Sequence, residues 1–263
     1  MQTSTALVLA GRRGSADPMA RARGLSHRAF LEVAGIPMLL RVVRALREAK
    51  HVGEVRVSID DAGALEAVPE LAAWREAGEL SVHASRESPA RSVADALAGI
   101  SGLPVLVTTA DHALLTGARI DAFLEGAAAS GADVAVGVVE RGAFRDEAAS
   151  AARTWLRLRC GDYTGANLFA FRNDRGRRAA DFFARAERHR KRPWRMLAAI
   201  GPTLGVEYLA GRLDLDTAAR HISRNVGARV RPVRLEESVA ALDVDKPEDL
   251  ALAERVLAGE TPA

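Results

Sequence analysis

Residues 6–14 read ALVLAGRRG, a short apolar run that leads directly into a segment with two glycines and two arginines. Apolar runs of this length are typical of buried parallel strands, so we expect a strand over 6–10. The following residues, 11–26, are rich in Gly and Arg and show no periodicity, which predicts a loop. A glycine beside cationic side chains at the end of a strand is suited to binding phosphate, because backbone N–H groups can approach its oxygens closely.

Strands and amphipathic helices alternate through the first half of the chain. The clearest strand is PVLVTTAD (104–111), a run that ends in an acid. Because strand–helix–strand units recur, we predict a mostly parallel sheet with helices on both faces, a three-layer α/β/α Rossmann-like fold. Ligands of such sheets bind at the carboxyl ends of the strands, where Gly11 and Asp111 both lie. The other elements expected are strands over 54–59, 80–84 and 134–139, a short extended piece with a turn over 30–37, and helices over 38–49, 68–77, 92–98 (with Ser92 as a possible N-cap) and 120–129.

The pattern changes after about residue 140. Alternating residues predict an antiparallel strand over 155–159, and a turn at 163–165 precedes an extended segment over 166–171. These pieces predict a small antiparallel extension of the sheet. The segment 241–245, ALDVD, reads as a strand end that presents carboxylates. The remaining elements expected are helices over 176–191, 194–209 (broken at 201–202) and 247–257, and a strand over 230–235.

Composition is that of an ordinary globular protein, with 48% hydrophobic and 27% charged residues. The single Cys160 excludes an intramolecular disulfide framework and a thiolate zinc site. No apolar run approaches the length of a membrane span, and residues 1–5 lack the basic stretch of a secretory signal. A cytoplasmic enzyme is the simplest interpretation.

Five segments, in order, resemble the motifs of the MobA-like nucleotidyltransferases, which have a GT-A-like Rossmann-type fold. The resemblance implies a reaction in which an alcohol or sugar phosphate attacks the α-phosphorus of a nucleoside triphosphate and pyrophosphate leaves. It also implies one domain over residues 1–263, with a nucleotide-binding half (1–140), an acceptor-side half (141–240) and a closing metal-binding turn and helix (241–263). The matching segments are LVLAGRRG (7–14), RAFLEVAGIPMLLRVVRAL (28–46), VLVTTADHALLT (105–116), TGANLFAF (164–171) and LDVDKPEDLALAERVL (242–257).

By this resemblance the opening loop wraps the triphosphate. The family usually shows LAGGxGxRMG, whereas this chain has Gly11-Arg12-Arg13-Gly14 followed by an insertion over 15–24. Arg28 stands where the family has a lysine; an arginine also neutralises phosphate, but its planar fork is not equivalent to a point charge. The alternative for this loop is a solvated basic segment. The nucleotide-binding residues implied are Leu9, Ala10, Gly11, Arg12, Arg13, Gly14, Arg28 and Thr109.

The resemblance places a Mg²⁺ ion between two aspartates. Asp111 occupies the position of the first metal ligand and Asp245 that of the second, so Arg28, Asp111 and Asp245 form the expected catalytic set. Mg²⁺ between two carboxylates removes their repulsion and bridges phosphate oxygens. Asp243, two residues away, is the competing ligand, and Asp111 alone also suits a turn or helix cap. Asn167 and Gly165 correspond to positions that face the acceptor.

The leading interpretation is a Mg²⁺-dependent nucleotidyltransferase that uses CTP, or secondly GTP, and a small phosphorylated acceptor such as a sugar or polyol phosphate. One alternative is a glycosyltransferase of the GT-A fold, although the expected Asp-x-Asp motif is replaced by Asp111-His112-Ala113. A second is a non-catalytic nucleotide-binding relative. Arginine content alone does not predict nucleic-acid binding, since no recognised motif accompanies it. The basic stretch over 185–195 predicts either a solvated face or peripheral membrane contact. Oligomeric state does not follow from the sequence.

Overall fold

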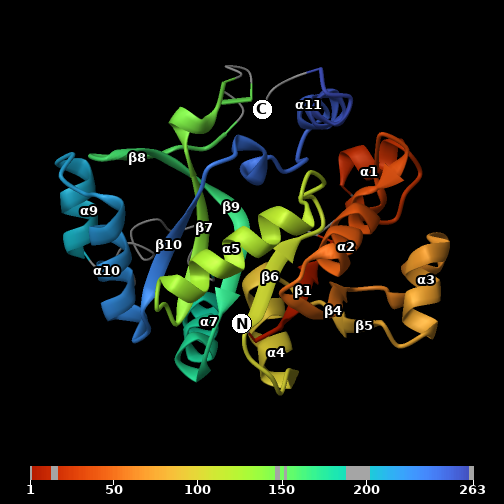
Figure 1. Cartoon of the computed structure of the whole chain (residues 1–263), viewed down its shortest axis with the longest axis horizontal. Helices are drawn as coiled ribbons and strands as arrows, with labels where there is room; N and C mark the ends of the chain where they lie inside the picture. Colours follow the sequence, from red (N-terminus) through yellow and green to blue (C-terminus); the bar gives the residue numbers. More distant parts are fainter. Residues whose placement is uncertain (1, 13–16, 146–148, 151–152, 188–201, 261–263) are drawn as a thin grey trace.

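The computed structural model describes residues 2–12, 17–145, 149–150, 153–187 and 202–260. Its centre is an eight-stranded sheet in the order β10-β7-β9-β6-β1-β4-β5, with β8 paired to β9 at one side (Figure 1). The predicted α/β class and mostly parallel sheet are confirmed. The strands of this sheet are β1 (Ser4–Leu9), β4 (Val52–Ile59), β5 (Leu80–Ala84), β6 (Val105–Thr109), β7 (Val134–Glu140), β8 (Leu156–Leu158), β9 (Gly161–Phe171) and β10 (Val230–Leu235).

Strand β1 lies at the topological switch point of the sheet, between β4 and β6. β1 pairs in parallel with β4 on one side and with β6 on the other, so that Leu9 lies opposite Ser58 and Thr109. The chain adds β4 and β5 on one side of β1 before it returns to add β6 on the other. Such a switch point leaves a crevice outside the carboxyl ends of the strands. The segments after β1, β4 and β6 therefore surround one site.

Successive residues of the central strands bury opposite sides, which produces three layers. Ala6 and Val8 face one apolar core with α2 (Met38–Glu48), α3 (Pro69–Glu76) and α5 (Gly117–Ala129). Leu7 faces the other core with α4 (Pro89–Gly99), α7 (Asp174–Glu187) and α10 (Leu215–Val226). A third cluster joins a two-stranded antiparallel sheet to the closing helix; its elements are β2 (Glu32–Val33), β3 (Ile36–Pro37) and α11 (Pro247–Leu257).

Three local predictions in the first half and at the chain end are wrong. The expected loop over 11–26 contains a short helix, α1 (Pro18–Ala22), because Asp17 accepts hydrogen bonds from its first backbone N–H groups. Ser92 is not the cap of α4: Ser88 caps a helix that begins at Pro89, and Ser92 is buried inside it. Residues 241–245 are not a strand end, since a 3₁₀ turn (Ser238–Ala241) leads into irregular backbone.

Two further differences concern the second half. No turn forms at 163–165; β9 runs unbroken to Phe171 and pairs antiparallel with both β6 and β7. The pairing with β7 shifts between Val136 and Val138, and the irregularity is absorbed near Asn167, which has a left-handed φ of 49°. Helix α10 was not predicted, although Asp214 caps its start and Gly227, with a φ of 72°, ends it.

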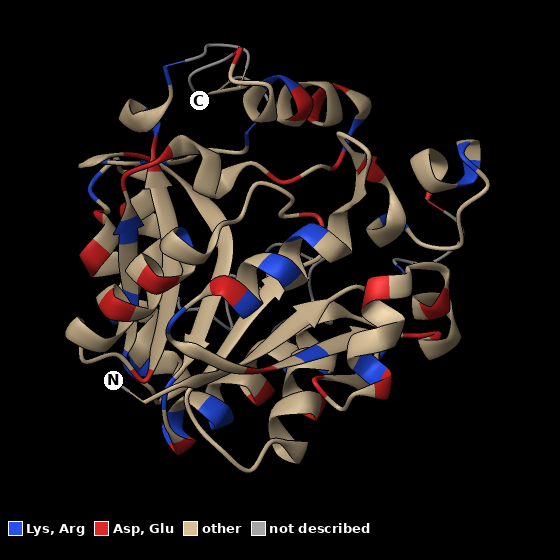
Figure 2. Ribbon diagram, turned by 45° about the vertical axis from the view of Figure 1, so that its right-hand side comes forward, with Lys and Arg blue, Asp and Glu red and all other residues tan. Residues whose placement is uncertain are grey.

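The predicted helices over 176–191 and 194–209 are described only in part, as α7 and as α9 (Pro202–Leu209). Residues 188–195 of the basic stretch lie outside the described part of the chain. Among the described helices, none is both long and apolar enough to cross a membrane. The ribbon in Figure 2 shows basic and acidic residues mixed over the helices and loops of this view.

We predict that Gly176→Ala destabilises the protein by about 1–3 kcal/mol, the usual cost of overpacking. A methyl group on Gly176 in α7 would lie 2.3 Å from the backbone oxygen of Asp133, so the helix would have to move away from the sheet. Urea unfolding measures the change. Gly99→Ala in α4 is the matched control, because nothing lies within 4 Å of its added methyl group. Equal stability of the two variants would contradict the contact.

Candidate active site

A cavity of about 470 Å³ lies at the carboxyl ends of β1, β4 and β6. Leu9, Ala10, Gly11 and Arg12 form one wall, as the opening motif predicts, and residues 109–111 form another. Residues 85–89, between β5 and α4, complete the wall beside Gly11. A cavity of this size accommodates a small ligand. Its position is the switch point of the sheet, so strand order alone places it there.

Gly11 is required where the opening segment passes closest to residues 85–89. A Cβ atom on Gly11 would lie 2.7 Å from the hydroxyl oxygen of Ser85. Arg12 is held nearby: its Nε donates to Asp60 at 2.5 Å, and its backbone N–H donates to the same carboxylate at 3.1 Å. The buried His27 contacts Asp60 as well, at 3.0 Å. Burial opposes the charge of Asp60, but the hydrogen bonds from Arg12 outweigh it and lower the pKa of Asp60.

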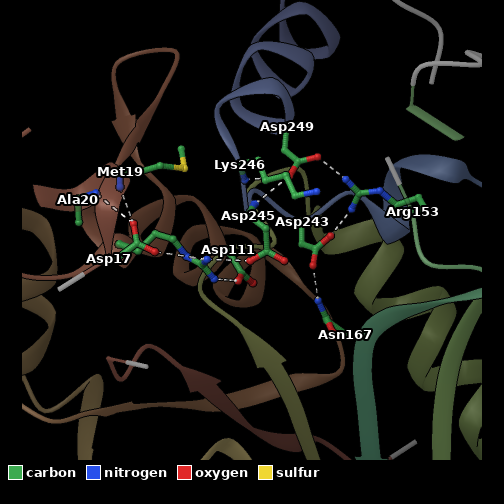
Figure 3. Close-up of polar contacts among 11 residues, drawn as sticks. Asp17, Met19, Ala20, Asp111, Arg153, Asn167, Asp243, Asp245, Lys246 and Asp249 are labelled. Carbon is green, nitrogen blue, oxygen red and sulfur yellow. Dashed lines mark hydrogen bonds and ion pairs between the residues drawn. The ribbon is translucent and has the colours of Figure 1, made fainter. Parts of the chain in front are cut away.

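Arg28 lines the cavity and is the centre of an ion cluster with Asp17, Asp111 and Asp245, the three carboxylates labelled on the left and in the middle of Figure 3. Its Nη2 lies 2.5 Å from Asp111, and its Nη1 lies 2.8 Å from Asp245 and 3.7 Å from Asp17. Burial alone would lower the pKa of Arg28, but these three carboxylates raise it above its usual value. The guanidinium is therefore charged and joins residues from three parts of the chain. The predicted set of Arg28, Asp111 and Asp245 is together in space.

A backbone hydrogen bond holds the segment that precedes α11 against the end of β6. The N–H of Val244 donates to the carbonyl oxygen of Asp111 at 3.0 Å, so the next residue, Asp245, lies beside Asp111. The carboxylate of Asp249 then accepts the backbone N–H groups of Asp245 and Lys246, at 3.1 and 2.9 Å, and fixes the start of α11. Asp249 is thus an acidic residue in the first turn of α11.

Arg153 fixes the same segment from the other side. Its side chain is only 7% exposed and forms ion pairs with Asp243 and with Asp249. Asn167 donates to the second oxygen of Asp243 at 3.2 Å. The carboxylate of Asp243 is thus occupied by Arg153 and Asn167, whereas that of Asp245 points toward Arg28 and Asp111 (Figure 3). Of the two candidate metal ligands, the geometry favours Asp245.

Several polar atoms at the site lack a partner within the described part of the chain. One carboxylate oxygen of Asp111, Oδ1, and the hydroxyl of Thr109 are buried without a hydrogen bond. Both ring nitrogens of the buried His112 are also unpaired. Burial lowers the pKa of His112 to about 4, although the nearby Asp243 opposes the shift. His112 is consequently neutral at neutral pH and packs behind the carboxylates.

The remaining residues that the sequence predicted for the site either lie outside the described part of the chain or do not line the cavity. Arg13 and Gly14 lie outside the described residues. Gly165 is exposed on β9 with open space around it, and Asn167 reaches the site only through Asp243. The sequence analysis missed Asp60, Arg153 and residues 85–89. Residues 85–89 follow the strand predicted over 80–84, so their position at a strand end was a usable signal. Nothing in the sequence indicated which residues pair with Arg153.

Comparison with known proteins agrees with this architecture. The sequence model of the MobA-like NTP transferase domain matches residues 6–230. A hypothetical transferase from Thermus thermophilus is 27% identical, with a TM-score of 0.76 over 95% of this chain and 100% of that one. A search of curated proteins found no match.

Two more distant structures share the fold. The synthetase of CMP-2-keto-3-deoxy-manno-octonic acid, complexed with CTP, is 14% identical, with a TM-score of 0.60 over 99% of this chain and 100% of that one. The 4-diphosphocytidyl-2C-methyl-D-erythritol synthase of Anaerococcus prevotii is 12% identical, with a TM-score of 0.59 over 98% and 96%.

We predict that Arg153→Met destabilises the protein by about 3–5 kcal/mol, because it leaves two carboxylates without their buried partner. Urea unfolding followed by circular dichroism measures the loss. Arg157→Met, an exposed arginine in the neighbouring β8, is the control and should stay within about 0.5 kcal/mol of wild type. A loss below about 1 kcal/mol for Arg153→Met would show that the ion pairs contribute no more than surface contacts.

We also predict a pH-dependent stability term from His112. The folded pKa of about 4 lies below the unfolded value of 6.5, so only the unfolded chain takes up this proton as the pH falls. The stability present above pH 6.5 is lost progressively down to about pH 4, by at most about 3 kcal/mol. His112→Leu removes this term, and its free energy of unfolding should fall less than that of wild type across the same pH range. Parallel curves would contradict the prediction.

Proposed function

Since this chain belongs to the family of MobA-like NTP transferase domains, we propose that it transfers a nucleoside monophosphate from a nucleoside triphosphate to a small phosphorylated acceptor. An acceptor oxygen attacks the α-phosphorus, the bond between the α-phosphorus and its bridging oxygen breaks, and pyrophosphate leaves. The observation that carries this proposal is the Arg28, Asp111 and Asp245 cluster beside a cavity formed by the opening motif.

The residues of the cavity have the chemistry that a triphosphate needs. The backbone of 10–12 passes along its wall without a side chain at Gly11, which permits close approach of phosphate oxygens. Arg12 and Arg28 supply positive charge, and both would exchange a carboxylate partner for phosphate. Neutralising and aligning the triphosphate is the main requirement of such transfers, and no general base is obligatory.

The carboxylates fit a hard divalent cation. Asp111 has a buried oxygen without a partner, and the side chain of Asp245 is 41% exposed. Both are oxygen ligands of the type that Mg²⁺ prefers, so these two residues would hold it. When bound, Mg²⁺ supplies charge neutralisation for the phosphates of the nucleotide and for the departing pyrophosphate.

CTP is the first candidate for the donor and GTP the second. Support for CTP comes from the two distant structures, since one is a complex with CTP and the other is a diphosphocytidyl synthase. The acceptor is proposed to be a sugar or polyol phosphate that enters from the side of β9, where Asn167 and Gly165 lie. The segment 85–89 lines the same cavity, and we propose that it contributes to contacts with the nucleotide.

The test is release of pyrophosphate from CTP, GTP, UTP, ATP or dTTP with Mg²⁺ and a panel of sugar and polyol phosphates. We expect turnover with one nucleotide, and a loss of at least about a hundredfold in Asp111→Asn, because one of the two carboxylates that would hold Mg²⁺ is removed. Asp181→Asn, which changes an exposed aspartate of α7, is the matched control. Tight nucleotide binding without turnover on any acceptor would favour a non-catalytic relative.

A further inference from the structure

Arg28 occupies the space between the two carboxylates that would hold a divalent cation. Its two terminal nitrogens reach different partners, Nη2 to Asp111 at 2.5 Å and Nη1 to Asp245 at 2.8 Å. The side chain is only 19% exposed, so the guanidinium is enclosed by the site. An arginine can bridge two carboxylates in this way because its donors form a planar fork, whereas the single ammonium of a lysine is a point charge.

The charge at this point is not balanced. Asp17, Asp111 and Asp245 surround Arg28, so the four side chains carry a net charge of −2 when all are ionised. In addition, Asp111 keeps one buried oxygen without a hydrogen bond, and its side chain is only 7% exposed. Both features point to a second positive group. The cluster would therefore attract a divalent cation once the guanidinium of Arg28 moves away from Asp111 and Asp245.

The described residues do not supply enough ligands to hold a metal by themselves. Within the ranges described, no group of three or more His, Cys, Asp or Glu side chains is arranged for an ion. Mg²⁺ commonly takes one or two carboxylates from a protein and completes its six ligands with water and substrate phosphates. The nucleotide therefore has to provide part of the coordination.

We infer that Arg28 is a built-in counter-cation that excludes a divalent ion from Asp111 and Asp245 until a nucleotide triphosphate binds. The phosphates then draw the guanidinium away from the carboxylates, and the divalent ion takes the place that it leaves. Nucleotide and metal consequently bind as a coupled pair, each increasing the affinity for the other. The exclusion of the metal follows from the geometry alone, while the release of Arg28 by nucleotide rests on the proposed function.

The experiment measures Mn²⁺ binding to the nucleotide-free protein by the electron paramagnetic resonance signal of free Mn²⁺. Wild type should bind weakly, and Arg28→Met should bind about tenfold or more tightly, because a positive charge a few ångströms from the ion is removed. Arg28→Lys should lie between the two, since one ammonium cannot bridge both carboxylates. Arg224→Met, which removes the same charge from an exposed site on α10, should behave as wild type.

The gain must also depend on the carboxylates. Adding Asp111→Asn to Arg28→Met should return Mn²⁺ binding to the wild-type level or below. Equal or weaker Mn²⁺ binding in Arg28→Met than in wild type would overturn the inference. If Arg28→Met does not fold, Arg28→Lys decides, because unchanged Mn²⁺ affinity in that variant overturns it equally.

The coupled step is tested with the α,β-methylene analogue of CTP, in which the bond that would break is blocked. In wild type the analogue should tighten Mn²⁺ binding by about tenfold, a common size for coupling between sites. In Arg28→Met that coupling should shrink, because the site is already open. Analogue binding without any effect on Mn²⁺ affinity in wild type would overturn the coupling. No binding of the analogue, with the Arg28→Met gain intact, would instead count against the proposed function and leave the exclusion of metal standing.

Discussion

Two ionised carboxylates that lie close together at the end of a buried sheet repel each other unless a cation lies between them. Asp111 follows β6 and Asp245 precedes α11, and Arg28 joins them. Like charges in a partly buried site repel strongly, so this arrangement depends on the guanidinium. The insertion after the opening motif contributes through α1, whose capping residue Asp17 adds a third carboxylate to the cluster. The ion cluster thus connects the first, middle and last parts of the chain at one point.

Arg153 provides a second constraint, because its ion pairs fix the position of the segment that leads into α11. A hydrogen bond from Val244 to the backbone of Asp111 brings that segment to the sheet, but it leaves the side chains of Asp243 and Asp249 largely buried. Buried charges are costly unless they are paired. Arg153 pairs both of them, and Asp249 in turn holds the backbone of Asp245. Arg153, from the second half of the chain, therefore sets the position of the carboxylate that faces Arg28.

The sequence was most informative where one local pattern determines the structure. Apolar runs located β1, β6 and β7, and the motifs placed Arg28, Asp111 and Asp245 in one site. Interactions across long separations in sequence were not accessible: nothing near Arg153 indicates that its partners are Asp243 and Asp249. The unbroken β9 was missed because Gly165 suggested a turn, whereas pairing of residues 163–165 with β7, and of Tyr163 with β8, keeps the strand extended. Helix α10 was missed although its capping residues, Asp214 and Gly227, are present, because it lies outside the five motifs.

The position of the second carboxylate bears on the choice between nucleotidyl and glycosyl transfer. Glycosyltransferases of this fold usually carry two aspartates in an Asp-x-Asp motif, and here the second would replace Ala113. That residue is 3% exposed and packs in the apolar cluster with Leu114 and Val239, so an aspartate there would be a buried charge in apolar surroundings. The chain instead brings Asp245 from a distant part of the sequence, on a segment that Arg153 holds through Asp243 and Asp249. Asp111 lines the same cavity as the opening motif, and Arg28 joins it to Asp245, so the position of Asp245 is consistent with the proposed attack on a triphosphate.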